Sequence, residues 1–122
     1  MAMAAVRYTF GYRSEELWLM GRATVPTVAP LSAPLVDLAG RSGFWCELRD
    51  GRGRPVHRQV LRDPRHPTDE VPAGGLRHVP NAEPAGVFTV LVPPAPDGGT
   101  VALIQRRATD AAPVDVLTVT AG

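Results

Sequence analysis

The sequence predicts an all-β protein, a two-sheet antiparallel sandwich of immunoglobulin-like type with about seven strands. Three observations lead to this prediction. Apolar and polar residues alternate at period two in several short segments, turn residues separate those segments at spacings of about 8 to 25 residues, and no long stretch has helical periodicity. The 122 residues are expected to form one domain, because this length suits a single hydrophobic core and no internal repeat divides it.

The first strand is predicted over residues 6–12. Its aromatic and β-branched residues recur at every second position and therefore share one face of a strand. These residues are Val6, Tyr8, Phe10 and Tyr12.

A second strand is predicted over residues 17–25. Its alternation places Leu17, Leu19, Gly21, Ala23 and Val25 on one face, with Trp18, Met20, Arg22 and Thr24 on the other. A helix over residues 15–22 is the alternative. Gly21 and Pro26 would stop that helix after about two turns, which is too short to be stable by itself, so the strand is favoured.

The clearest element is a β-hairpin in the middle of the chain. Residues 44–49 alternate between apolar and charged side chains, Asp50-Gly51 marks the turn, and alternation resumes over residues 56–61. Cys46 shares a face with Phe44 and Leu48, which predicts a small buried side chain. As the single cysteine, it also excludes an intramolecular disulfide.

Two long connections flank this hairpin. Residues 26–43 hold three prolines, with a short edge strand expected near residues 35–38. Residues 62–86 hold five prolines and a Gly-Gly pair, which indicates either a mobile loop or an irregular segment that crosses from one sheet to the other. We predict that this segment is the most mobile and that trypsin cuts it first, at Arg65 or Arg77.

Three strands are predicted beyond the second connection. Residues 87–92 form a nearly continuous apolar run, which predicts a central strand buried on both faces. Further strands follow over residues 100–106 and 114–120. From the alternation in all these segments, the expected core contains Tyr8, Phe10, Leu17, Leu19, Phe44, Cys46, Leu48, Phe88, Val90, Val101 and Leu103.

No constellation of catalytic or metal-binding residues can be recognised. The three histidines His57, His66 and His78 are far apart and lack the closely spaced partners that metal ligands usually have. The serines do not lie in a nucleophile-elbow pattern, and the Gly-Gly pairs lack the strand–loop–helix context of a phosphate-binding loop. We therefore expect no enzyme activity, no metal site and no cofactor.

Charge is the most suggestive surface feature. The chain carries a net charge of +1, yet residues 49–66 contain six arginines against two aspartates. A local excess of this kind can attract an acidic protein face or a phosphate backbone, and a solvated hairpin tip is the alternative. The candidate residues are Arg52, Arg54, His57, Arg58, Arg62 and Arg65.

Two tryptophans complete the candidate surface. Trp18 and Trp45 both fall on strand faces opposite the predicted core faces. Because aromatic side chains dominate the centres of protein interfaces, this placement predicts contacts with a protein partner. The alternatives are a different strand register, or a covering of the two rings by residues 26–43.

The order of these segments resembles a known module. Residues 43–50, the turn into Val56-His57-Arg58, residues 88–93 and Val101-Ala102-Leu103 are together similar to the N-terminal β-sandwich of IgA-peptidase-like metallopeptidases. The resemblance covers residues 6–118 and implies a non-catalytic sandwich, because the zinc motif of that family belongs to a separate domain. This chain contains no His-Glu-x-x-His, so no catalytic or metal residue is carried over.

These observations together predict an interaction or structural module that binds a protein partner, alone or within a larger assembly. The alternative is a binder of an anionic ligand or nucleic acid through the Arg-rich hairpin of residues 49–66, although a nucleic-acid partner is not expected because Trp45 is the only aromatic residue nearby. The N-terminus lacks a secretory signal pattern, and no apolar run reaches the roughly 20 residues that span a bilayer. A cytoplasmic location and no membrane partner are therefore expected.

Overall fold

The computed structural model describes residues 4–34, 43–65, 84–106 and 112–121. They form seven strands, and all of the strand pairs are antiparallel. The strands are β1 (Ala5–Arg13), β2 (Glu16–Val25), β3 (Gly43–Arg49), β4 (Pro55–Leu61), β5 (Ala85–Val92), β6 (Thr100–Arg106) and β7 (Val114–Thr120).

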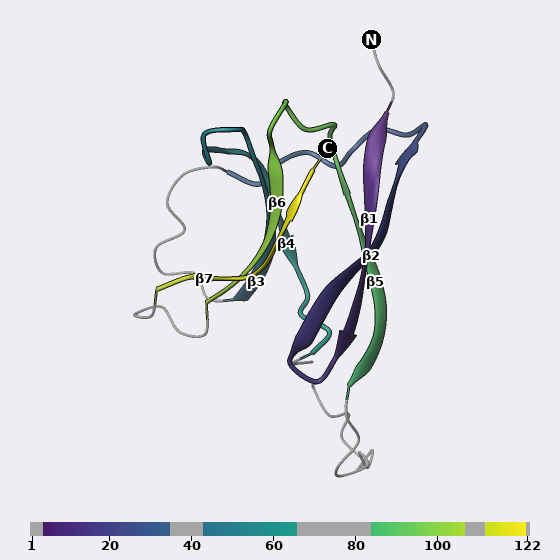
Figure 1. Cartoon of the computed structure of the whole chain (residues 1–122), viewed down its shortest axis with the longest axis vertical. Coiled ribbons are helices and arrows are strands. Elements are labelled where there is room, and N and C mark those ends of the chain that lie inside the picture. The colour runs from purple at the N-terminus through teal and green to yellow at the C-terminus, as the bar shows by residue number, and fades with distance from the viewer. Residues whose placement is uncertain (1–3, 35–42, 66–83, 107–111, 122) are drawn as a thin grey trace.

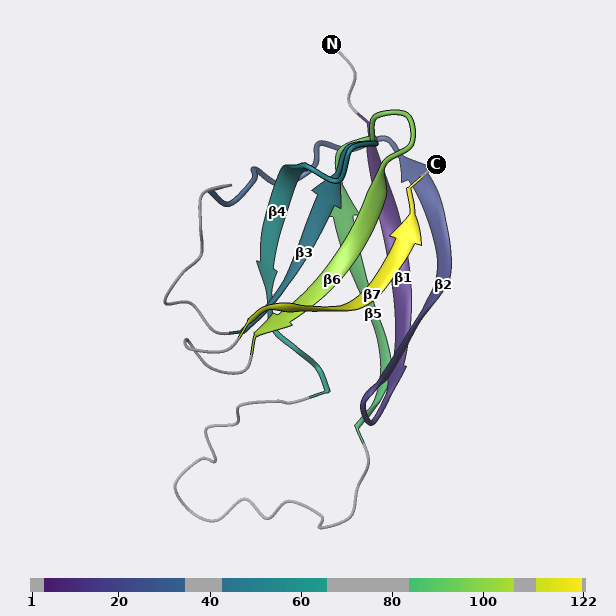
Figure 2. The same cartoon turned by 60° about the vertical axis from the view of Figure 1, so that its left-hand side comes forward.

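The strands form two sheets that pack face to face (Figures 1 and 2). One sheet has the order β2-β1-β5 and the other has the order β4-β3-β6-β7. The chain passes from one sheet to the other after β2, after β4 and after β5, so each sheet is built from segments far apart in the sequence. The all-β, two-sheet antiparallel sandwich predicted from the sequence is confirmed.

The core lies between the two sheets and is made by alternate residues of each strand. Phe10 and Phe88 stack with ring centroids 5.4 Å apart, and Phe44 meets Phe88 edge-on from the opposite sheet at 6.3 Å. All eleven residues predicted for the core belong to this apolar cluster. Eight of them are buried, while Leu17, Leu19 and Phe88 are partly buried and pack against the others.

A β-bulge changes the predicted faces of β2. Gly21 pairs with Thr9 and Leu19 pairs with Phe10, which leaves Met20 as an extra residue between them. Because side chains alternate along a strand, one extra residue reverses the alternation beyond it. Arg22 therefore lies opposite the buried Tyr8 on the inner face, and Ala23 lies on the outer face, the reverse of the prediction.

The prediction of a central strand over residues 87–92 was wrong. Strand β5 lies at the edge of the three-stranded sheet, and the Val87 side chain is 56% exposed. Only alternate residues of β5, such as Val90 and Val92, are buried. A continuous apolar run is typical of a strand covered on both faces, but here the outward-facing half of the run remains uncovered.

Polar contacts join the two sheets at the margins of the core. The Tyr8 hydroxyl donates to the Ala121 carbonyl over 3.3 Å, and the Arg22 guanidinium donates to the Thr120 carbonyl. On the other side of the sandwich the Gln59 amide donates to the Leu91 carbonyl. Burial raises the pKa of Tyr8, so this hydroxyl stays protonated and available as a donor.

Two sequence predictions lie outside the described residues. They are the short edge strand near residues 35–38 and the part of the predicted mobile segment that covers residues 66–83, which includes Arg77. At the described end of that segment, Arg65 is 4% exposed and therefore poorly accessible to trypsin.

The first testable prediction concerns the aromatic core. Replacing Phe10, which is 1% exposed, by Ala should lower the free energy of unfolding by about 3–5 kcal/mol because the ring leaves a cavity. Replacing the partly buried Phe88 by Ala should lower the free energy of unfolding by a smaller amount. Val87→Ala, on the neighbouring exposed position, is the control and should change stability by no more than about 0.5 kcal/mol. Urea unfolding measures all three, and equal losses for Phe10→Ala and Val87→Ala would contradict the assigned faces.

Candidate partner-binding surface

The six arginines of residues 49–66 do not form one exposed basic patch. Arg58 is 9% exposed and donates from Nη2 and Nε to Glu47 Oε2, at 2.6 Å and 2.9 Å. Arg49 donates to the other oxygen of Glu47 at 2.8 Å. Its two terminal nitrogens donate to the two carboxylate oxygens of Asp115, at 2.8 and 3.0 Å. These four side chains form an ion-pair row over the outer face of the four-stranded sheet, which we call the outer charge row.

The outer charge row neutralises arginines that the sequence alone counted as free charge. Asp115 comes from β7, sixty-six positions from Arg49, and it holds the pKa of Arg49 above its ordinary value. In return, the hydrogen bonds from Arg49 lower the pKa of the Asp115 carboxyl. A partly buried row of this kind holds its strands in position relative to one another. Because its charges are paired, it leaves little positive electrostatic potential to attract an anionic ligand.

Arg65 connects both sheets at the end of the sandwich that holds the β1–β2 turn. Its guanidinium binds Asp63 Oδ2 at 3.0 Å, the Glu15 carbonyl at 3.0 Å and Gln105 Oε1 at 3.3 Å. It also lies 5.4 Å from the centroid of the Phe44 ring. Because Glu15 lies in the β1–β2 turn and Gln105 lies in β6 of the other sheet, Arg65 closes this end of the core and is not available to a partner.

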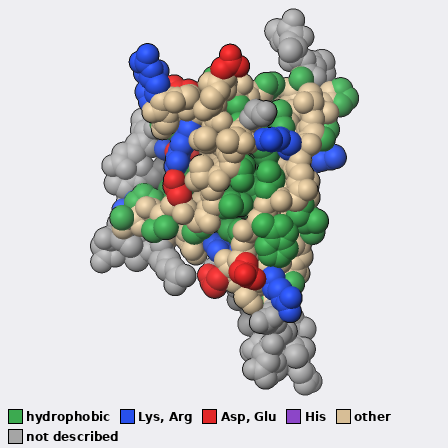
Figure 3. All heavy atoms as spheres, viewed as in Figure 1, with side chains coloured by type: hydrophobic (Ala, Val, Ile, Leu, Met, Phe, Trp, Pro, Cys, Tyr) green, Lys and Arg blue, Asp and Glu red, His purple; other side chains and the backbone are tan. Residues whose placement is uncertain are grey.

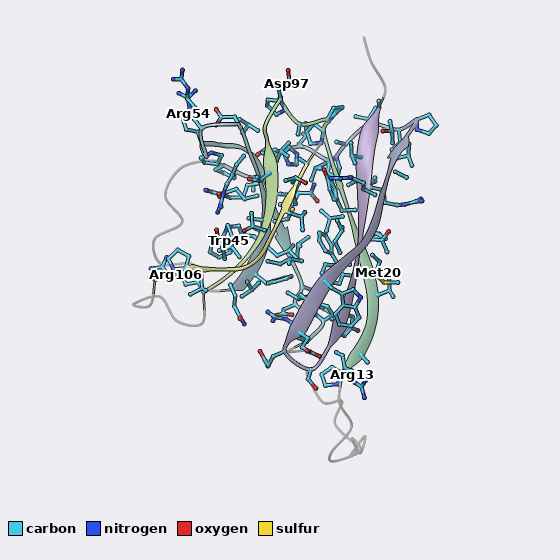
Figure 4. All side chains as sticks on the ribbon, viewed as in Figure 1. Arg13, Met20, Trp45, Arg54, Asp97 and Arg106 are labelled. Carbon is cyan, nitrogen blue, oxygen red and sulfur yellow. The ribbon has the colours of Figure 1, made fainter. Side chains whose placement is uncertain are left out.

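Three candidate arginines remain exposed, namely Arg52, Arg54 and Arg62. Arg52 and Arg54 lie in the β3–β4 turn, which Asp50 organises by accepting from both of their backbone N–H groups at 2.9 Å. Those backbone hydrogen bonds lower the pKa of Asp50. Figure 4 shows Arg54 at the far end of this turn, pointing away from the molecule. An exposed pair such as Arg54–Asp50 contributes little to stability, so this turn is a solvated tip.

Trp45 and His57 are both buried. Trp45 is 4% exposed and packs with Ala102 and Ile104 in a small cluster on the outer face of the four-stranded sheet (Figure 4). His57 is 6% exposed and lies on the inner face, opposite Leu48, with Nε2 at 2.9 Å from the Pro30 carbonyl. Trp45 therefore points away from the core, as predicted, but it cannot serve as an exposed anchor.

The chain before β3 covers the free edge of β4. The Ala33 N–H donates to the Arg58 carbonyl at 2.7 Å, and the Arg58 N–H donates to Ser32 Oγ at 3.0 Å. Arg58 also reaches the Pro34 carbonyl with its guanidinium. Part of the segment that the sequence offered as a possible cover, residues 26–43, thus lies along this sheet.

The outer face of the three-stranded sheet is different, because it is apolar and open. Trp18 is 42% exposed, Met20 is 56% exposed and Val87 is 56% exposed. Trp18 and Val87 both lie opposite Gly11, on either side of β1, so they share one row across the sheet. We call Trp18, Met20 and Val87, with the sheet between them, the apolar outer face. Figure 3, which views the two sheets edge-on, shows hydrophobic side chains on the side of the molecule formed by β1, β2 and β5, and Figure 4 shows Met20 pointing outward.

Gly11 fixes the position of the Trp18 ring. A Cβ atom placed on Gly11 would lie only 2.5 Å from the indole, so the ring rests directly on the Gly11 backbone. Any larger residue at position 11 would displace it. Trp18 therefore already packs on the β1 backbone before any partner arrives, and a side chain that is packed in advance loses less entropy on binding.

A shallow groove of about 340 Å³ lies next to Met20 on the three-stranded sheet. Its lining residues are Arg7, Thr9, Met20, Gly21, Arg22 and Ala23. The groove follows from the bulge at Met20, because the small residues Gly21 and Ala23 occupy the outer face next to it. The two small residues that form this groove can be read from the sequence. The bulge that turns them to the outer face could not be predicted from the alternation of apolar and polar residues.

The described residues contain no cluster of three or more His, Cys, Asp or Glu side chains that could hold a metal ion. Burial raises the pKa of Cys46 to about 12, which keeps the group a thiol rather than a reactive thiolate at neutral pH. Within the described part of the chain, no helix has the length and apolar character needed to cross a bilayer.

Comparison with known proteins gave no relative: no family model, no curated protein and no solved structure matches the chain.

The second testable prediction concerns Arg65. Replacing Arg65 by Ala should lower the free energy of unfolding by about 3–5 kcal/mol, because it leaves the nearly buried Asp63 carboxylate without its partner. Arg62→Ala, which removes an exposed arginine three positions away, is the matched control and should cost no more than about 0.5 kcal/mol. Thermal and urea unfolding compare the two variants. If both lose the same small amount, Arg65 does not close the core.

The third testable prediction concerns pH. The pKa of Cys46 is raised by folding from 9.0 to about 12, so the folded protein holds its proton more tightly than the unfolded chain. The resulting stabilisation is complete below pH 9 and is lost as the pH rises towards 12. The free energy of unfolding should therefore fall more steeply over this interval in the wild type than in Cys46→Ala. Parallel slopes for the two proteins would contradict the burial of the thiol.

Proposed function

We propose that this chain is a non-catalytic, immunoglobulin-like β-sandwich module that binds a protein partner through its apolar outer face, the surface of Trp18, Met20 and Val87. The observation that carries this proposal is an exposed, preorganised tryptophan. Trp18 remains 42% exposed although its ring packs on the Gly11 backbone. Large apolar patches on a soluble domain commonly mark interaction sites, and tryptophan is enriched among the residues that dominate binding energy.

The surroundings of Trp18 also suit a protein partner. Met20 supplies a flexible apolar side chain that can adapt to different surfaces, and Arg7 lies at the groove with a long amphipathic side chain. An apolar centre with a polar or charged rim is the usual composition of a protein interface. The arginines Arg52, Arg54 and Arg62 add exposed positive charge elsewhere on the molecule, and we propose that they steer an acidic partner rather than anchor it.

The immunoglobulin-like part of the proposal draws support from strand order. The sheet β4-β3-β6-β7 follows the order of the sheet that contains strands C, F and G in immunoglobulin domains, with an added strand beside C. The three-stranded sheet differs from that order in having β1, not β2, at its centre. The similarity to the N-terminal sandwich of IgA-peptidase-like metallopeptidases is kept as part of this proposal, as is a cytoplasmic location, which suits the free buried Cys46.

Binding of an anionic ligand through residues 49–66 is the weaker candidate. Arg49, Arg58 and Arg65 are each paired with carboxylates. The remaining exposed arginines lie on two separate turns or strand ends, so no described observation favours a phosphate-binding surface.

The fourth testable prediction concerns Trp18. The chain is immobilised, proteins bound from an extract of its source are identified, and the strongest is purified and titrated against wild type and Trp18→Ala. Losing the indole should raise the dissociation constant roughly tenfold to a hundredfold, mainly through faster dissociation. The affinity should depend only weakly on salt, because the contact is apolar.

Val114→Ala is the matched control, because Val114 is 57% exposed but lies on the other sheet. It should leave the affinity unchanged, and circular dichroism should show that all variants are folded. Equal affinities of wild type and Trp18→Ala would refute the proposed surface. A steep fall of affinity with salt, together with a loss on Arg52→Ser and Arg54→Ser, would favour the anionic-ligand alternative.

A further inference from the structure

Three of the four sheet edges carry a feature that blocks pairing with another strand. The β4 edge is covered by the hydrogen bonds from Ala33 and to Ser32. The β2 edge is broken by the bulge at Met20 and lies against β7, where Arg22 binds the Thr120 carbonyl. The β7 edge carries its own bulge and the charged Asp115. Bulges, charges and covering segments are the usual protections of sheet edges.

Among the residues that the structure describes, none protects the β5 edge in a comparable way over most of its length. Its eight residues, Ala85–Val92, include no charged residue and no proline. Val87 is 56% exposed, and Ala85, Gly86 and Thr89 are exposed as well. A run of β-branched and aromatic residues without charge, at an exposed edge, is the type of strand that pairs with another chain. Pro84 and Pro93 bound it on either side, which limits such pairing to β5 itself.

The contact between Gln59 and Leu91 shows which backbone groups of β5 are available. The Leu91 carbonyl accepts from Gln59, a residue of the opposite sheet, so it points away from β1. Along an antiparallel edge strand, alternate residues direct both N–H and C=O to the same side. The N–H and C=O groups of Thr89 and Val87 therefore also point to the open edge, and Gln59 occupies only the carbonyl of Leu91.

We propose that β5 pairs antiparallel with β5 of a second copy of this chain. With the two-fold axis at Phe88, Val87 of each copy lies opposite Thr89 of the other, and the outward backbone groups of these two residues satisfy each other. The two three-stranded sheets then join into one six-stranded sheet. The partly buried Phe88 rings meet across the axis on the inner face.

A second copy fits this edge better than an unrelated strand for two reasons. The strand has no charge, so two copies approach without like-charge repulsion across the axis. The pairing is also isologous, the form that closed dimers use most often, because each copy offers the same strand. The proposal uses the backbone groups at the edge of β5, whereas the proposed function uses the outward side chains of Trp18, Met20 and Val87. The two share Val87, but neither is a premise of the other.

The test measures the mass of the chain in solution by sedimentation velocity at increasing concentration. Wild type should shift from the 13.0 kDa monomer to twice that mass. Thr89→Lys should raise the dissociation constant of the dimer at least tenfold, since it places two like charges beside the axis. Thr89→Pro removes an outward N–H and should have the same effect. Thr24→Lys, on an exposed position of β2, is the matched control and should not change the dimer.

Hydrogen exchange provides a second readout that does not depend on the variants. In wild type, amide exchange within residues 85–92 should slow as concentration rises and the dimer forms, while exchange in β7 should not change. A chain that stays monomeric up to about 1 mM would overturn the proposal. So would a dimer that Thr89→Lys leaves intact while the β5 amides gain no protection, because that dimer would use another surface.

Discussion

The packing of two inner sheet faces is the constraint on which the rest of this structure depends. Each strand ladder lies within one sheet, so the sheets are joined chiefly by the apolar side chains between them and by a few polar contacts at the margin. Burial of apolar area is non-directional, but a pleated strand presents only every second residue to it. The period-two alternation of the chain is a direct consequence. The bulge in β2 reverses that alternation and brings Arg22 to the inner face, where its guanidinium reaches the Thr120 carbonyl at the margin of the core.

The outer faces are free of that constraint, and the two sheets use them differently. The four-stranded sheet carries the outer charge row and a buried tryptophan, with part of the preceding chain along its edge. The three-stranded sheet leaves Trp18 and Met20 exposed over a backbone of small residues. Apolar area that stays in contact with water forgoes the free energy of burial, whereas the charged groups of the four-stranded sheet are compensated by their partners. This asymmetry directs attention to the three-stranded sheet as the surface with a role beyond folding.

Three of the six arginines within residues 49–66 have a structural role. Arg65 fixes the end of the core, while Arg49 and Arg58 hold β3, β4 and β7 together through Glu47 and Asp115. Arginine suits this role because its planar guanidinium donates in several directions at once and remains charged when buried. Residues 49–66 therefore carry an excess of positive charge when counted along the chain, but in the folded protein carboxylates from other segments neutralise much of it. Counting charges along a chain predicts a charged surface only where the ion-pair partners of those residues are also close in sequence.

The amino-acid sequence was enough to predict the sandwich, the central hairpin and the eleven core residues, because alternation and turn chemistry are local properties. It could not determine that residues 87–92 form an edge strand, since a covered and an uncovered apolar face look alike until the neighbouring strands are placed. Nor could it give the bulge at Met20, the pairing of Arg49 with Asp115, or the burial of Trp45 and Arg65. Each of these depends on which segments meet across long stretches of chain. That choice is made by packing free energy summed over the whole core, and only the tertiary structure records its outcome.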